Sequence, residues 1–396
     1  MTVIWIVWIL FQVIIGYNLV VPLLLYFFTF FAKNKIKTFN AVEADYAIIV
    51  TAYEQVTHIP EVVKSILKLS YENYLIYIVA DKCDVSSLHF TDERVIILRP
   101  EKTLASNTRS HLYALKNFKR EHDRLTIIDS DNLVHPGYLV ELNKWFNQGF
   151  VAVQGVREAK NLNTTFACLD AARDIYYHFY DGKILFKAGS SATLAGSGMA
   201  FTTSLYRDFL EKKDVAGAGF DKVLQSEIVG KGLRIAFAEK AIVYDEKTSQ
   251  SDQLVNQRAR WINTWFKYFS LGFSLISRSV ANLNWNQFLF GFVLLRPPLF
   301  IFLLLSFFCM AVNIFISPIF VAAWLTGFLI FVLGFYIALK KSDTDKRIYQ
   351  SLINIPKFIF FQVLSLSKAR KANQRSVATK HFHNSAIEQI VKSDES

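Results

Sequence analysis

Asp129 and Asp131, two aspartates separated by a single serine, are the residues of this sequence best suited to chemistry. They follow Ile127 and Ile128, two apolar β-branched residues that predict the end of a buried strand. Side chains alternate along an extended backbone, so both carboxylates point the same way. Paired carboxylates can bind a hard divalent cation, and that cation can hold a diphosphate. An Asp-x-Asp pair is also common in ordinary polar turns. The other motifs of the chain must therefore show whether this pair is a metal site.

The elements that would position these aspartates alternate between strand and helix along residues 45–240. The pattern predicts strands at 46–50, 75–80, 95–98 and 126–129, with helices at 60–69 and about 107–118. This order predicts a mainly parallel sheet, in which ligands bind at the carboxyl ends of the strands. Asp81 and Asp129 both end a predicted strand. Two acidic strand ends in one sheet favour a nucleotide pocket.

Three later motifs add to this picture. Gly196-Ser197-Gly198 allows close approach of a ligand, although an ordinary turn explains it equally well. Asp221 taken alone would be a solvated residue at a helix start. In Gln257-Arg258-Ala259-Arg260-Trp261, Arg260 suits a phosphate because a guanidinium can bind it through two hydrogen bonds. An arginine-rich helix beside a tryptophan is also typical of a membrane surface.

The composition indicates an integral membrane protein. The chain is 52% hydrophobic, contains 36 phenylalanines and carries a net charge of +11, which favours a basic cytosolic face over nucleic-acid binding. Residues 1–32 contain no charge, are long enough to span a bilayer and lack the basic start of a signal peptide. Lys33, Lys35 and Lys37 follow, which predicts that the downstream chain is cytosolic. The uncharged residues 297–339 are enough for two spans with a turn near 313–318.

In this order, the motifs resemble those of the membrane-bound family 2 glycosyltransferases, which include the cellulose, hyaluronan and poly-N-acetylglucosamine synthases. The resemblance covers residues 44–265, and the Gln-x-x-Arg-Trp signature at 257–261 is its most specific part. It implies an α/β GT-A fold, which is Rossmann-like with a mainly parallel sheet, flanked by transmembrane helices. It also implies a nucleotide-sugar donor and Mg²⁺ or Mn²⁺ as the cofactor.

The resemblance also implies roles for individual residues. Those expected to line the nucleotide-sugar pocket are Thr51, Ala52, Tyr53, Asp81 and Asp129. Asp131 would be the ligand of the metal on the diphosphate. Those expected to face the diphosphate and the acceptor sugar are Gly196, Ser197, Gly198, Gln257, Arg260 and Trp261.

The sequence departs from the family pattern at two places. Glu54-Gln55 stands where relatives usually carry Asn-Glu, which weakens the expected uracil and ribose contacts. Gly219-Phe220-Asp221 stands where relatives carry the Glu-Asp of the catalytic base. Asp221 is aligned with the base because a leucine follows at +3 and a glycine at +11. Glu227 is the competing carboxylate. A single base without an enzyme nucleophile predicts inversion at the anomeric carbon.

The expected organisation is an amino-terminal transmembrane anchor (1–32), a GT-A domain (44–263), an interfacial helix (264–283), a transmembrane hairpin (297–339), and an interfacial helix with a basic, polar tail (350–396). The expected function is inverting, metal-dependent transfer from a UDP-sugar to a growing glycan, in the cell membrane of a bacterium. Single addition to a lipid-linked acceptor is the alternative, and a non-enzymatic membrane subunit is a third. One amino-terminal helix and one hairpin are few spans to enclose a glycan channel. A channel would therefore need a homo-oligomer or an export partner.

Overall fold

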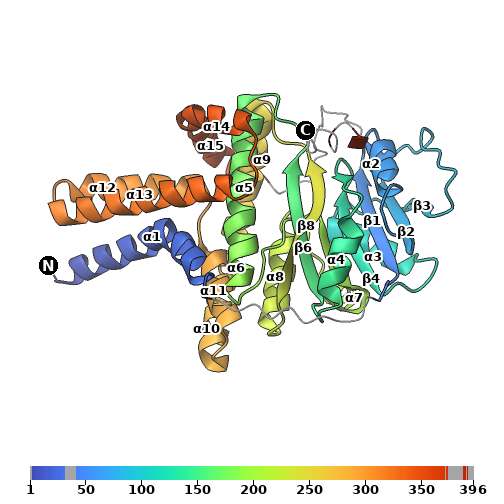
Figure 1. Ribbon diagram of the computed structural model, residues 1–396, viewed down its shortest axis with the longest axis horizontal. Coiled ribbons are helices and arrows are strands. Elements are labelled where there is room, and N and C mark those ends of the chain that lie inside the picture. The colour runs from blue at the N-terminus through green and yellow to red at the C-terminus, as the bar shows by residue number, and fades with distance from the viewer. Residues whose placement is uncertain (1, 32–41, 371, 373–386, 389, 391–396) are drawn as a thin grey trace.

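The computed structural model describes residues 2–31, 42–370, 372, 387–388 and 390 of the chain. This part of the protein consists of a sheet covered by helices and a bundle of apolar helices that projects from one side of it (Figure 1). Lys33, Lys35 and Lys37, on which the predicted orientation in the membrane depends, lie outside the described residues, as does most of the predicted basic tail.

The sheet has eight strands in the order β3-β2-β1-β4-β7-β6-β8-β5. Their bounds are β1 Tyr46–Tyr53, β2 Tyr74–Asp81, β3 Val95–Leu98, β4 Arg124–Asp129, β5 Leu133–Val134, β6 Ala152–Ala159, β7 Met199–Thr202 and β8 Ile235–Asp245. The strands β3, β2, β1 and β4 are parallel, as the alternating pattern predicts. β7 pairs antiparallel with both β4 and β6, so the sheet as a whole is mixed.

Helices between the strands bury the sheet. The first group comprises α2 Ile59–Ile66, α3 Asn107–Lys116, α4 Tyr138–Phe146, α7 Thr203–Lys212 and α8 Phe220–Gly230. α3 packs against β1 and β2, and α4 packs against β6 and β8. The strands β1 and β2 are almost entirely buried, which explains why their sequences are continuous apolar runs and not alternating ones.

A long helical stretch beside the sheet contains a π-helical segment. α5 (Thr165–Tyr177) continues through the π segment His178–Ile184 into α6 (Leu185–Lys187). π segments inside α-helices are rare and often occur at functional sites. This segment contacts α1, which enters from the projecting bundle.

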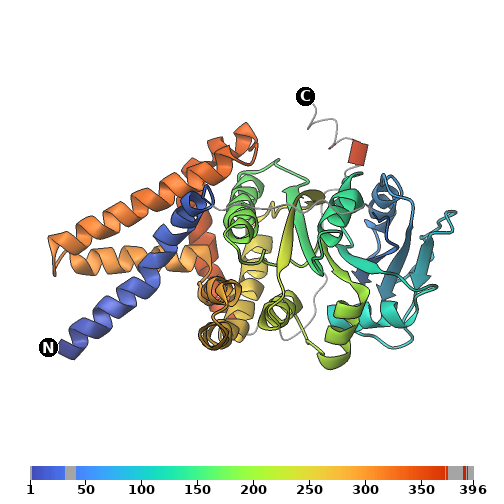
Figure 2. The same cartoon turned by 60° about the horizontal axis from the view of Figure 1, so that its bottom comes forward.

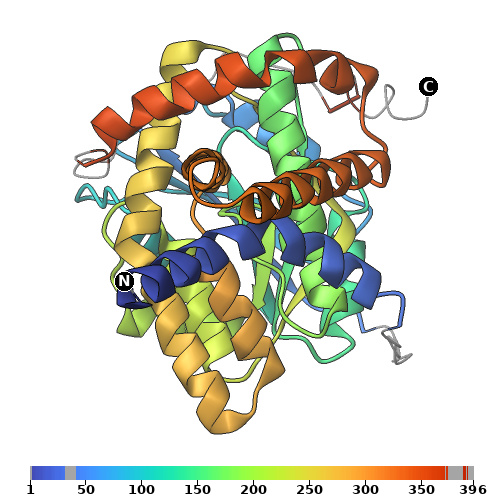
Figure 3. The same ribbon diagram turned by 90° about the vertical axis from the view of Figure 1, so that its left-hand side faces the viewer.

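Four further helices lie between the sheet and the bundle. They are α9 Ser251–Tyr268, α10 Leu271–Asn282, α11 Trp285–Leu295 and α15 Ile355–Ala369, with α14 Lys346–Ser351 and the 3₁₀ turn Leu352–Asn354 preceding α15. α15 packs along α9, and Figure 3 shows it crossing that end of the molecule. α9 runs continuously through residue 264, where the sequence predicts the start of a separate interfacial helix.

The projecting bundle consists of α1 (Thr2–Phe28), α12 (Leu299–Asn313) and α13 (Pro318–Lys340), which extend together away from the sheet (Figure 2). Within the part of the chain that the structure describes, two helices, Val3–Phe28 and Pro318–Lys340, are long and apolar enough to cross a membrane. α12 alone is shorter, but α11 and α12 together, bent by 77°, would bring the number to three. The turn between α12 and α13 lies at the predicted position.

Polar side chains join the bundle internally. The Gln12 side-chain oxygen of α1 accepts hydrogen bonds from Asn313 Nδ2 of α12 and, at 2.8 Å, from Trp324 Nε1 of α13. In an apolar environment an amide without a partner is costly, so these bonds fix the relative positions of the three helices.

Candidate active site

The parallel register brings the predicted strand-end residues together. Tyr53 is paired with Asp81 across β1 and β2, and Thr51 is paired with Asp129 across β1 and β4. These residues therefore share one edge of the sheet, at the carboxyl ends of three adjacent strands. This is the edge at which an open parallel sheet binds ligands.

Asp81 is buried, and its carboxylate holds a loop. The two oxygens accept backbone N–H groups of Leu104 at 2.9 Å and Ala105 at 2.7 Å. Ala105 has a positive φ of 46°, a conformation that non-glycine residues rarely adopt and that these contacts help to maintain. Asp81 thus positions the loop entering α3 and also lines the adjoining cavity.

The turn carrying Asp129 and Asp131 is held from behind by Ser197. The fully buried Ser197 hydroxyl accepts from the Asp129 backbone N–H at 3.1 Å and from Asn132 Nδ2 at 2.8 Å. Gly198 has φ +66°, and a Cβ on it would lie 2.9 Å from the Val243 side chain. Ser197 and Gly198 line neither cavity described below, so they support the acidic turn from the interior, in contrast to the predicted ligand contact.

A cavity of about 390 Å³ opens at this sheet edge and is called here the donor cavity, after the role that the sequence predicts for its lining residues. It is lined by predicted residues from four parts of the chain: Thr51, Ala52, Tyr53, Asp81, Asp129, Asp131, Gln257, Arg260 and Trp261. The side chains of Gln257, Arg260 and Trp261 reach it from one face of α9, as their i, i+3, i+4 spacing allows. The structure therefore assembles the strand-end motifs and the α9 motif around one space.

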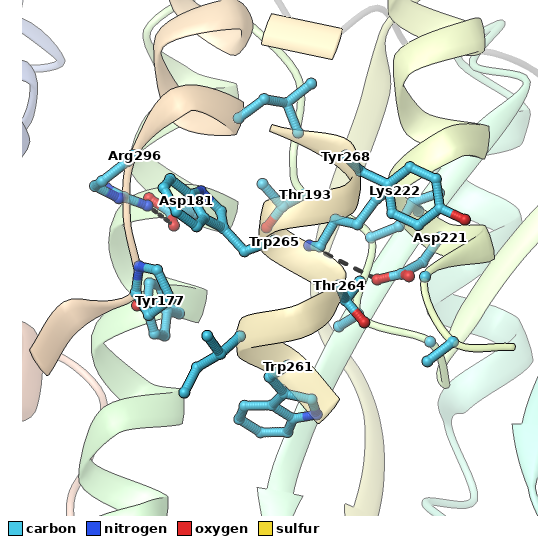
Figure 4. A pocket seen from close by; sticks show the side chains of 18 of the residues that line it. Tyr177, Asp181, Thr193, Asp221, Lys222, Trp261, Thr264, Trp265, Tyr268 and Arg296 are labelled. Atoms are coloured by element: carbon cyan, nitrogen blue, oxygen red, sulfur yellow. Dashed lines mark hydrogen bonds and ion pairs between the residues drawn. The ribbon is translucent and has the colours of Figure 1, made fainter. Parts of the chain in front are cut away.

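A second cavity of about 420 Å³ lies between the sheet and the apolar bundle and is called here the acceptor cavity, after the role that the sequence predicts for Gly196 and Asp221. It contains Gly196 and Asp221, the remaining predicted residues that reach a cavity. Asp129 and Trp261 line both cavities, so the two spaces adjoin. In Figure 4, Asp221 and Lys222 lie on one side of the acceptor cavity and Asp181 and Arg296 on the other, with Trp265 between them.

Asp221 occupies the first turn of α8 and lies 3.7 Å from Lys222 Nζ. The residue before this helix, Gly219, has φ +101°, and a Cβ there would lie 2.6 Å from both Thr264 and Tyr268 of α9. Glycine is therefore required for α8 to begin this close to α9. The competing carboxylate of Glu227 lines neither cavity and pairs with Lys213 at 3.2 Å.

Trp261 is held between two arginines. The guanidinium carbon of Arg258 lies 4.0 Å from the centre of the indole, and that of Arg173 lies 4.1 Å away. Each such contact contributes about 0.5–2 kcal/mol, so the ring is firmly oriented where the two cavities meet. Gln257 Oε1 accepts from Arg258 Nη1 at 3.1 Å and from the Thr248 hydroxyl at 3.0 Å.

The arginines belong to a buried cluster of charges behind α9. Its cations are Arg157, Arg173, Lys247 and Arg258, and its anions are Asp170, Asp174 and Asp245. Burial favours neutral Asp170, but Arg258 and Arg173 outweigh it and lower the pKa of this carboxyl. Burial lowers the pKa of Arg258 to about 10, which still leaves it charged at neutral pH. Arg258 and Asp170 therefore form an ionised pair at neutral pH.

Several lining residues were not predicted. Asp245 is the last residue of β8, Glu246 follows it, and both line the donor cavity, so the strand-end argument applied to Asp81 would have found them. Arg157 lies inside β6 and faces both cavities, and Asp181 lies in the π segment. Neither carries a local sequence signal.

The acidic turn fits a divalent cation that arrives with its substrate. Among the described residues, no group of three or more His, Cys, Asp or Glu side chains could hold a metal ion. Asp129 and Asp131 both line the donor cavity. Mg²⁺ is commonly bound by one or two carboxylates, with substrate phosphates and water completing its shell. Two aspartates in a cavity that can admit a diphosphate suit this type of binding.

Residues 44–264, more than half of the chain, match the model of the family described as glycosyltransferase like family 2. The protein therefore belongs to this family of glycosyltransferases.

Solved structures share the fold at low sequence identity. A mannosyltransferase, PcManGT from Pyrobaculum calidifontis in complex with GDP-Man and Mn²⁺, matches with a TM-score of 0.54 and 14% identity, over 91% of this chain and 98% of that chain. TarS (residues 1–349) from S. aureus with UDP-GlcNAc matches with a TM-score of 0.42 and 12% identity, over 83% and 90%. No curated protein sequence matches. The family and the mannosyltransferase identify the fold as GT-A, as predicted.

Proposed function

We propose that the protein transfers a sugar from a UDP-sugar to a glycan at the membrane, with inversion at the anomeric carbon. The observation that carries this proposal is that Asp129 and Trp261 line both cavities. A nucleotide-sugar in the donor cavity would present its anomeric carbon where the cavities meet. An acceptor hydroxyl could then approach from the side of Asp221.

Residues at the sheet edge would bind the donor. Thr51, Ala52, Tyr53 and Asp81 would surround the uridine, and Asp129 would contact the nucleotide. Asp131 would hold Mg²⁺ or Mn²⁺ on the diphosphate, with Asp129 beside it in the cavity. When bound, such an ion neutralises negative charge on the leaving diphosphate. Gln257 and Arg260 line the same cavity and would cover the diphosphate from α9.

Asp221 would act as the general base. The acceptor oxygen forms a bond to the anomeric carbon while the bond from that carbon to the diphosphate oxygen breaks, and its electron pair leaves with UDP. The acceptor proton passes to the Asp221 carboxylate. One displacement from the face opposite the leaving group inverts the configuration. The support for Asp221 over Glu227 is that only Asp221 lines the acceptor cavity.

The membrane setting is also part of the proposal. The apolar helices α1 and α13 would anchor the protein in a bacterial cell membrane, with the sheet and both cavities on the cytosolic side. A growing glycan is the acceptor implied by the synthases that the motifs resemble. A homo-oligomer or an export partner would be needed to enclose a channel.

The donor reaction provides the direct test. Detergent-purified protein is incubated with Mn²⁺, glycan acceptors and a panel of UDP-sugars, with GDP-mannose for comparison, and release of the nucleoside diphosphate is measured. We expect release from a UDP-sugar that EDTA abolishes and that Asp131→Ala reduces to background. No release from any nucleotide-sugar would refute the proposal, and EDTA-resistant activity in Asp131→Ala would refute the metal assignment.

A further inference from the structure

Both faces of the Trp261 indole are covered by arginine side chains. The guanidinium carbons of Arg258 and Arg173 lie 4.0 Å and 4.1 Å from the ring centre. Two planar guanidinium groups cannot both lie this close to one ring centre on the same face without overlapping, so they occupy opposite faces. A sugar that stacks on an aromatic ring needs a free face. The Trp261 ring is therefore not a stacking platform in this arrangement.

The two arginines are held in place by carboxylates. Arg258 Nη2 contacts Asp170 Oδ1, and Arg173 Nη2 lies 3.2 Å from the same oxygen and also contacts Asp174. The side chains of Arg258 and Arg173 are 3% and 11% exposed. Uncovering a face of the ring would take a charged group out of a buried cluster and leave its partners unpaired, which is costly. The faces therefore stay covered when a substrate binds.

The edge of the indole carries the only polar group of this side chain. Within the described residues, the Trp261 N–H has no hydrogen-bond partner, and unlike the N–H of Trp265 it is not enclosed by protein. Trp261 lines both cavities, and Figure 4 shows its ring one turn before Trp265 on α9. Because its faces are covered, the part of Trp261 that a substrate can meet is this edge. An indole N–H can only donate a hydrogen bond.

The residues around this edge favour one type of ligand group. Besides Trp261, those that line both cavities are Asn107, Asp129, Arg157 and Ala218. A carboxylate such as that of Asp129 can only accept hydrogen bonds, whereas a hydroxyl both donates and accepts. A saccharide hydroxyl at this point can therefore donate to Asp129 and accept from Trp261 at the same time.

We propose that Trp261 recognises a saccharide hydroxyl through its indole N–H, and that Arg173 and Arg258 are positioning residues that hold the ring edge-on to the two cavities. This inference rests on the proposed transfer reaction, in which the donor sugar and the acceptor sugar meet where the cavities adjoin. The hydroxyl belongs to one of these two sugars. A single fixed donor would orient that sugar about the reacting atoms.

Trp261→Phe tests the role of the N–H, because phenylalanine keeps an aromatic ring between the arginines and lacks the donor. We expect kcat/KM for transfer to fall about 2–10-fold, the effect of one hydrogen bond between neutral groups, while the Kd for UDP with Mn²⁺ stays unchanged. A sugar stacked on the ring would tolerate phenylalanine. Trp145→Phe is the matched control, since Trp145 of α4 lines neither cavity.

The Kd of the UDP-sugar that supports the fastest UDP release distinguishes the two sources of the hydroxyl. If the hydroxyl belongs to the donor sugar, Trp261→Phe weakens binding of this UDP-sugar and leaves binding of UDP unchanged. If it belongs to the acceptor, both Kd values stay unchanged and the KM of the acceptor rises.

Arg173→Met tests the positioning role, because methionine retains an apolar stem and removes the guanidinium from one face of the ring. An indole that is free to turn should lose its orientation, so kcat/KM should fall while the Kd for UDP stays that of the wild type. Trp261→Phe should then add little to the loss, because both changes act on the same hydrogen bond. An increase in kcat/KM in Arg173→Met would show that the sugar stacks on the uncovered face, and would overturn the inference.

The remaining outcomes separate this inference from the proposed function. Transfer by Trp261→Phe at the wild-type kcat/KM, or a loss no larger than in Trp145→Phe, would overturn the N–H contact while the transferase activity stands. A Kd for UDP that rises as much as kcat/KM falls would also overturn it, because the effect would then not depend on a sugar. Absence of UDP release from every UDP-sugar by the wild type would refute the transferase activity, and the inference with it.

Discussion

The ion pair between Asp181 and Arg296 should be important for stability. Asp181 lies in the π segment that follows α5, and Arg296 lies at the break between α11 and α12. The pair joins the helices beside the sheet to the chain that enters the apolar bundle. Both side chains are 8% exposed, so neither charge is well solvated.

Removing one partner should cost more than removing both. Asp181→Asn keeps the side-chain size but leaves the Arg296 charge buried without its carboxylate, a change worth about 3–5 kcal/mol. A domain of this size loses about 2–4 °C of melting temperature per kcal/mol, so we expect a decrease of about 6–20 °C. Replacing both residues with apolar ones, as in Asp181→Leu with Arg296→Met, should be far less destabilising.

Thermal unfolding in detergent, followed by tryptophan fluorescence at one fixed scan rate, measures these differences. Asp214→Asn is the control, because Asp214 pairs with Arg109 at 2.7 Å but both side chains are about half exposed. Such exposed pairs contribute about 0–1 kcal/mol. A shift in Asp181→Asn no larger than the control, or a double variant as unstable as Asp181→Asn, would refute the reasoning.

Three further predictions concern the base, the orientation in the membrane and the response to pH. Asp221→Asn should lower turnover about 10²–10⁴-fold with little change in UDP binding, whereas Glu227→Gln should retain turnover. An inactive Glu227→Gln with an active Asp221→Asn would show that Glu227 is the base. A cysteine introduced at Ser317, between α12 and α13, should react with an impermeant reagent added to intact cells, and protection there would contradict the proposed orientation. Burial lowers the pKa of His111 to about 3, below its ordinary value of 6.5, so the stability due to neutral His111 is present above pH 6.5 and is lost as the pH falls towards 3. Between pH 7.5 and 5.5 this loss of stability is about 1.4 kcal/mol. The melting temperature should therefore fall less over this range in His111→Gln than in the wild type. An equal fall in both proteins would contradict the lowered pKa of His111.

The strand ends were predictable because their signals are local. β3 occupies the predicted residues Val95–Leu98, and β4 ends at Asp129 as expected. Apolar β-branched runs that end in an acidic residue identify both the strand and its functional end. Parallel pairing then brings such ends together without further information, which is why the lining of the donor cavity follows largely from the sequence.

The acceptor side was less predictable because it depends on contacts between distant segments. Asp181 and Arg296 are 115 residues apart. The residues around each of them form no motif that predicts the ion pair. The charged cluster that orients Trp261 draws on α5, β6, β8 and α9. The antiparallel insertion of β7 also depends on pairing with strands that lie far away in the sequence.

The hydrogen bonds of Gln12 have a consequence for biosynthesis. Gln12 lies 301 residues before Asn313 and 312 residues before Trp324, its two partners in the bundle. At a synthesis rate of about 5–20 residues per second, the ribosome needs roughly 15–60 s to reach them. In the proposed membrane arrangement, α1 carries a polar amide that has not met these partners during that interval. The order of synthesis therefore makes closure of the bundle a late step, which can begin only after the whole sheet has left the ribosome.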